Sequence, residues 1–314
     1  MCNEESKIYK DIEEQIAKIV KETINQRGKE ILMLSNIKDH YFHLSSSVFL
    51  NASKSKHIKQ VVEEKTGDSQ ELFDSVFRSV IVKLSGQSFI PFMMSEVDRE
   101  YQSFMLEMIT GAYESAKRTL RWILETTIWS YAFQALRSSS ISELVDETIE
   151  EQRSYSNINL CREKEQEITS NVYVVLLQFK EMFQFRPPIS KITDKISFLE
   201  KERIKKELNK LYGNLSKHVH FTPESTIMIK PSDIKQPFSP LFGKFDQNLF
   251  DGTFNLAVDV FDVLFAFLLC TNASYFNYPS VKEYIQDYDQ KEALLKLTKS
   301  CNFDLTRKVI KVNI

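Results

Sequence analysis

Residues 208–223 concentrate the side chains that are best suited to do chemistry. If this stretch is a helix, its leucines and Val219 form an apolar stripe, while Tyr212, Ser216 and His220 recur every four residues on a neighbouring face. Pro223 ends the helix, so His220 lies in the last turn, where the negative end of the helix dipole raises the basicity of an imidazole. His220 could therefore transfer protons near neutral pH, or it could simply cap its helix and hydrogen-bond to a core neighbour.

A second pair of charged residues lies upstream, where Arg121 and Glu125 are four positions apart. At this spacing they could form an ordinary salt bridge on the surface of one helix. Their neighbours, including Trp122 and Ile128, leave the helix little purely solvated surface. A pair buried among such residues is more often kept for geometry or function, so a role in a site stays open.

The run 211–220 resembles the signature of HEPN-like helical proteins, and the upstream Arg and Glu strengthen the similarity. The resemblance covers roughly residues 97–275 and rests on these matches: Tyr212, Leu215-Ser216, Val219-His220, Arg121 and Glu125. It implies a helical domain that binds or acts on RNA, in stress response or in defence against mobile elements. Ribonucleolytic members usually form homodimers, whose two motifs face one cleft and cut RNA without a metal through attack of the ribose 2′-hydroxyl.

The sequence departs from that family pattern where an Arg is expected four to six residues before the His. Gly213 and Asn214 occupy this place, giving Asn214-x3-His218 or Asn214-x5-His220, and the nearest cation is Lys217. A lysine is a flexible point charge and lacks the planar fork with which Arg holds a phosphate. The departure puts cleavage in doubt, although Arg121 from a facing helix could take the role. The candidate catalytic residues are His220, Arg121, Glu125, Ser216, Tyr212, Asn214 and His218.

Other chemical sites have weaker support. Residues 191–217 hold eight basic and four acidic residues, a pattern that could guide RNA phosphates but is more often that of a solvated helix face. His40 with His43, and His218 with His220, lack a third ligand, so we expect no metal and no cofactor. Glycine-rich phosphate loops and nucleophile elbows are absent from the sequence.

The elements that must position these residues are predicted to be helices. Only 7 of the 314 residues are glycine, which disfavours folds that need many tight turns. Apolar periodicity predicts a helix at 7–22 that is ended by residues 25–28. It predicts further helices at 29–50, 53–64, 68–83, 97–136 (one long helix or two), 163–185, 192–219 and 253–275, and a last helix from 279–280 to about 300. Residues 141–153 are interpreted as a polar connection, residues 223–252 as an irregular Pro-rich excursion, and the tail 305–314 is left unassigned.

The fold class predicted is therefore an all-α bundle. Pro91 suggests a soft divide between an N-terminal helical region, 1–96, and a HEPN-like bundle, 97–314. The most apolar stretch, 255–276, is too short in its unbroken part to span a bilayer and is predicted to be a buried central helix. The acidic start and the scattered cysteines, with no Cys-x-x-Cys pair, lead us to expect a cytoplasmic protein with reduced thiols and no membrane contact.

Two interpretations remain open at this stage. The chain is either a HEPN-like protein that binds or cleaves RNA without a metal, with His220 as proton-transfer group, or a non-catalytic helical interaction protein. In the second case Tyr212, Ser216, His220, Arg121 and Glu125 form a buried polar network that fixes how the helices pack. In both cases we expect the Arg121 helix to lie beside the Tyr212 helix, and a homodimer is compatible with either.

Overall fold

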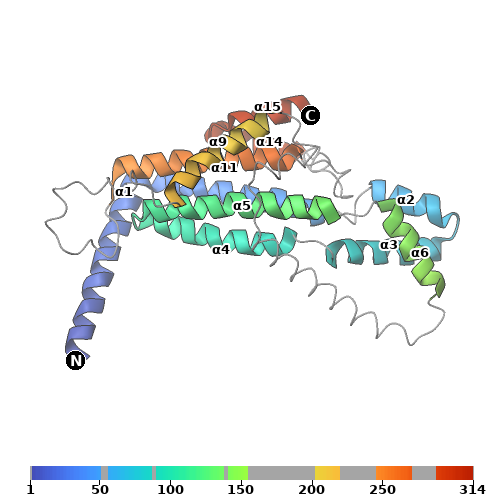
Figure 1. Ribbon diagram of the computed structural model, residues 1–314, viewed down its shortest axis with the longest axis horizontal. Coiled ribbons are helices and arrows are strands. Elements are labelled where there is room, and N and C mark those ends of the chain that lie inside the picture. Colours follow the sequence, from blue (N-terminus) through green and yellow to red (C-terminus); the bar gives the residue numbers. More distant parts are fainter. Residues whose placement is uncertain are drawn as a thin grey trace.

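The computed structural model describes residues 2–50, 56–86, 90–137, 141–154, 202–219, 245–270 and 288–313. Within these ranges every regular element is an α-helix, which confirms the all-α fold class (Figure 1). The helices are α1 (Cys2–Leu50), α2 (Lys56–Thr66), α3 (Gln70–Gly86), α4 (Ile90–Ile109), α5 (Tyr113–Arg137), α6 (Ile141–Ser154), α9 (Glu202–Val219), α11 (Gln247–Cys270), α14 (Tyr288–Ser300) and α15 (Asp304–Asn313).

The main bundle is built around the antiparallel pair α4 and α5, which pack along most of their lengths. A short turn separates them, and Gly111 there adopts a φ of 77°, a left-handed conformation that glycine accepts without steric cost. The amide of Ala112 closes the turn by donating to the carbonyl of Glu107 at 2.8 Å. The stretch 97–136 is thus two helices rather than one.

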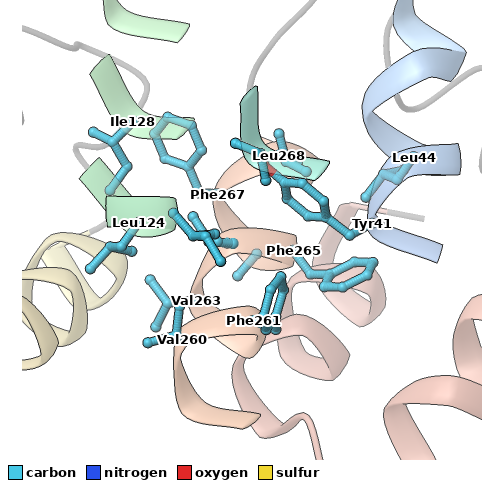
Figure 2. Close-up of a cluster of buried hydrophobic side chains, with 14 of the residues drawn as sticks. Tyr41, Leu44, Leu124, Ile128, Val260, Phe261, Val263, Phe265, Phe267 and Leu268 are labelled. Atoms are coloured by element: carbon cyan, nitrogen blue, oxygen red, sulfur yellow. The ribbon is translucent and has the colours of Figure 1, made fainter. Parts of the chain in front are cut away.

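Helix α11 lies in the core of the bundle, as predicted for the most apolar stretch. Phe261 and Phe265 are fully buried, and the ring of Tyr41 from α1 meets both of them edge to face. Leu124 and Ile128 of α5 approach the same cluster (Figure 2). By length and composition α11 could cross a membrane, but 56% of that stretch is buried in the structure, as expected for a core helix.

Helix α1 kinks at Arg27, whose φ of −133° and ψ of 22° are not helical. This confirms the predicted break at 25–28, although the hydrogen-bonded helix continues through it. The Arg27 guanidinium donates to Asp251 of α11 at 2.8 Å and lies 3.4 Å from Glu30, so the kink is tied to the bundle. The part of α1 before the kink projects away from the bundle as an arm, while the part after it packs against α4 and α11 (Figure 1).

Helices α2, α3 and α6 pack against one another as a three-helix unit beside the main bundle. The interpretation of 141–153 as a polar connection was wrong, because the few apolar residues of α6 fall on one face: Leu144, Val145 and Ile149 are buried. The predicted break before α3 is confirmed. Gly67 ends α2 with a φ of 61°, and the Ser69 hydroxyl accepts from the amide of Leu72 at 3.4 Å.

The unassigned tail forms helix α15, and its first amides are satisfied from outside the helix. The Asp262 carboxylate of α11 accepts from the amides of Leu305 at 2.9 Å and Thr306 at 2.8 Å, acting as an N-cap supplied by another element. The Pro-rich excursion ends earlier than predicted, because α11 already begins at Gln247 with Asp246 as its cap. The predicted helix 163–185 and residues 192–201, 220–244 and 271–287 lie outside the described residues.

Candidate functional site

The contact between α5 and α9 brings together three of the predicted site residues. Arg121 donates from Nε to Glu125 Oε1 at 2.9 Å and from a terminal nitrogen to the hydroxyl of Tyr212 at 3.0 Å. The guanidinium carbon also lies 4.8 Å from the centre of the Tyr212 ring, within the range of a cation–π contact. Arg121 and Tyr212 are 91 positions apart in sequence, so this contact fixes how α9 lies along α5.

Both partners of the ion pair are largely shielded from solvent. The side chain of Arg121 is 13% exposed and that of Glu125 is 8% exposed. One terminal nitrogen of Arg121, Nη1, is buried and has no hydrogen-bond partner among the described residues. A guanidinium held by a carboxylate, a phenol and an aromatic ring has little open surface left to receive a phosphate.

The last turn of α9 is joined to the first turn of α5 by a separate set of contacts. His218 Nδ1 lies 2.9 Å from Glu114 Oε2, and Arg118 Nε donates to the carbonyl of His218 at 3.0 Å. Burial acts to raise the pKa of the Glu114 carboxyl, but hydrogen bonds and charge from Lys117 and His218 outweigh it and lower that pKa. This second contact is more open, because His218 is 29% exposed and Glu114 is 48% exposed.

Among the described residues, the candidates Ser216, Asn214 and His218 make no hydrogen bond or ion pair with Arg121. The Ser216 hydroxyl donates to the carbonyl of Tyr212 at 2.7 Å within its own helix, and Asn214 is exposed on the outer surface of α9. His218 belongs to the Glu114 contact instead. His220, the proposed proton-transfer group, lies outside the described residues, as does its relation to Arg121.

Sequence reasoning missed the charged residues at the start of α5. Glu114, Lys117 and Arg118 lie one to two turns before Arg121, on a helix already identified, but only the position of α9 shows that Glu114 and Arg118 reach His218. It also missed Glu107 of α4, which accepts a hydrogen bond from Thr119 at 2.8 Å. No local signal in the sequence could have joined these residues to α9, because the contacts depend on how the helices pack.

In the part of the chain that the structure describes, no group of three or more His, Cys, Asp or Glu side chains is arranged to hold a metal ion. His40 and His43 lie one turn apart on α1, and burial lowers the pKa of His40. The described thiol, Cys301, is buried, and burial raises its pKa, which disfavours the reactive thiolate.

No family model, no curated protein and no solved structure matches this chain. The resemblance to HEPN-like proteins therefore stays a prediction that rests on the motif in 211–220 and on the Arg121–Glu125 pair.

Proposed function

We propose that this chain is a non-catalytic helical interaction protein, in which Arg121, Glu125 and Tyr212 clamp α9 onto α5. One observation carries the proposal: the Arg121 guanidinium is engaged in a closed packing contact, with its side chain 13% exposed. For cleavage, this guanidinium would have to face a phosphate in an open cleft, because the motif in α9 has Asn214 where the family has an arginine.

A buried ion pair serves such a protein by specifying geometry. Removing two charges from water costs about as much free energy as their attraction returns, so the pair adds little net stability. The pair instead restricts geometry. The Arg121 guanidinium can bind Glu125 and the Tyr212 hydroxyl at the same time only when α9 has one position along α5. A defined position of α9 in turn presents one defined outer surface to a partner.

The proposal is tested by incubating purified protein with single-stranded and structured RNA in the presence of a chelator. We expect no cleavage by the wild type, and the same result for His220→Ala, His218→Ala and Arg121→Ala. RNA cleavage that the wild type performs and that His220→Ala loses by about 10²–10⁴-fold would contradict the proposal and favour a metal-independent ribonuclease.

A double variant separates the two functions further. Arg121→Met with Glu125→Leu replaces the ion pair by apolar side chains of similar size, so the bundle should keep its stability although α9 loses the directional contact that sets its position. A catalytic arginine could not be replaced in this way. Wild-type cleavage that disappears in a folded double variant would therefore also overturn the proposal.

A further inference from the structure

Charge is distributed unevenly over the helices of this nearly neutral chain. Helix α9 carries five basic and two acidic residues, and α14 with α15 carries six basic and three acidic residues. By contrast, α4 has one basic and four acidic residues, and α6 has one basic and five acidic residues. In Figure 1, α9, α14 and α15 lie along the upper side of the bundle and α4 along its lower side. The helices with an excess of basic residues and the acidic helix α4 are therefore on different sides of the bundle.

Three lysines form a line on the outer surface of α9. Lys206, Lys210 and Lys217 are exposed and are spaced by four and seven residues, which places them on one face of the helix over a length of about 16 Å. This face is opposite to the buried stripe that contains Leu208 and Leu215. Lys210 lies 3.6 Å from Glu207 yet keeps a side chain that is 68% exposed.

Helix α15 contributes two further exposed lysines, Lys308 and Lys311. The Asp262 cap fixes the start of α15 on α11. Helix α9 also packs against α11, where burial, Asp262 and Glu207 raise the pKa of Asp259 one turn before the cap and Lys210 of α9 opposes them. Helices α9 and α15 therefore flank the same stretch of α11.

We propose that this α9–α15 lysine face, formed by Lys206, Lys210, Lys217, Lys308 and Lys311, binds the phosphate backbone of a nucleic acid. The inference names a partner class for the interaction protein proposed above and rests on that function. Lysines act as point charges toward phosphates and need no planar fork, and several of them together release counterions from a polyanion.

The composition of the face favours a nucleic acid backbone over other partners. Between the lysines on α9 the exposed residues are Gly213 and Asn214, so the line offers no aromatic ring on which a base could stack. It also offers no apolar side chain for the centre of a protein interface or for insertion into a membrane. The exposed large apolar residues among the described ones lie on other helices: Ile24 and Leu32 on α1, and Leu106 on α4. Binding should therefore depend strongly on salt and little on base sequence.

The test measures fluorescence anisotropy of labelled single-stranded RNA and of a labelled duplex over a salt series. The test variant is Lys206→Gln/Lys210→Gln/Lys217→Gln. The matched control is Lys10→Gln/Lys18→Gln/Lys21→Gln, which removes three exposed lysines from the arm of α1. We expect the test variant to bind about 10- to 100-fold more weakly and to reduce the salt slope for single strands by about two units. The control should keep wild-type affinity, and circular dichroism should be unchanged in both.

Several outcomes would overturn the inference. These are no binding of either nucleic acid at low salt, equal weakening by the two triple variants, or binding of anionic phosphatidylserine vesicles without binding of nucleic acid. A further contradicting outcome can be measured by sedimentation velocity. If the α9 triple variant loses self-association but keeps nucleic acid binding, the lysine face contacts an acidic surface of a second copy of the chain. The proposed function fails separately, because His220-dependent cleavage would remove it even where the lysine face still bound RNA.

Discussion

Helix α5 makes two contacts that differ in kind. Toward α11 it presents buried side chains such as Leu124 and Ile128, which pack in the core beside Phe267 (Figure 2). Toward α9 it presents Arg121, which pairs with Glu125 of its own helix and donates a hydrogen bond to the Tyr212 hydroxyl. The first contact gains free energy from removing apolar area from water and tolerates small shifts, because the hydrophobic effect has no preferred direction. The second gains little net free energy and requires one arrangement.

The two contacts of α5 should therefore affect different properties of the protein. The α5–α11 contact should determine how much free energy is needed to unfold the bundle, whereas the α5–α9 contact should determine where α9 sits. Substitutions can separate the two roles, because core changes act through volume while changes at the α9 contact act through charge and direction.

The largest effect is expected in the core. Phe265→Ala removes a fully buried ring that contacts Tyr41 and Phe303, and should lower the free energy of unfolding by about 3–5 kcal/mol. Urea denaturation followed by circular dichroism measures it. Leu106→Ala, at a side chain that is 59% exposed, is the control and should cause little change. Equal effects of the two substitutions would show that α11 is not the centre of the core.

Breaking the clamp on one side should have the next largest effect. Arg121→Met removes the guanidinium that pairs with the largely buried carboxylate of Glu125 and should cost about 3 kcal/mol. Adding Glu125→Leu should recover most of that loss, since both charges of this pair are then removed. The same denaturation experiment compares the single and double variants. A double variant about as unstable as the single one would mean that the pair contributes net stability, and the contrast with the core would be lost.

The cap of α15 should contribute less. Asp262→Ala removes the acceptor for the amides of Leu305 and Thr306, and should cost about 1–2 kcal/mol. Amide hydrogen exchange should rise mainly in 304–313, because the helix start is freed while its apolar face still packs. Asp304→Ala, at an exposed residue paired with Arg307 in the same helix, is the control and should leave exchange unchanged.

The smallest effect is expected at the open end of the α5–α9 contact. Lys117 and His218 lower the pKa of Glu114 below its usual value of 4.5, so the ionised carboxylate stabilises the folded state above that pH. Since the group is 48% exposed, Glu114→Gln should cost only about 0.2–1 kcal/mol at neutral pH.

The contribution of Glu114 to the stability of the folded state should depend on pH. Because the folded pKa is the lower one, the stabilisation is lost as the pH falls below 4.5 and through the lowered pKa, so wild type and Glu114→Gln should converge in acid. Thermal unfolding as a function of pH measures this. A difference that grows in acid would contradict the assigned direction.

Local pattern was enough to predict much of this protein. The spacing of apolar residues predicted the all-α class and the buried helix that became α11, and a short polar run predicted the kink at Arg27. The four-residue spacing of Arg121 and Glu125 places their side chains on one helix face, whatever surrounds them. Such features depend on residues within a few turns of each other, and for that reason they can be read from the sequence alone.

Only the tertiary structure decided which of these faces meet. The Tyr212 hydroxyl that completes the clamp, the Asp262 cap of α15 and the pairing of Glu114 with His218 all join different helices. Helix α6 was missed because its few apolar residues become informative only against α2 and α3. The amphipathic pattern of each helix defines a buried face, but its position along a neighbour depends on side-chain volumes and on directional bonds between residues tens of positions apart.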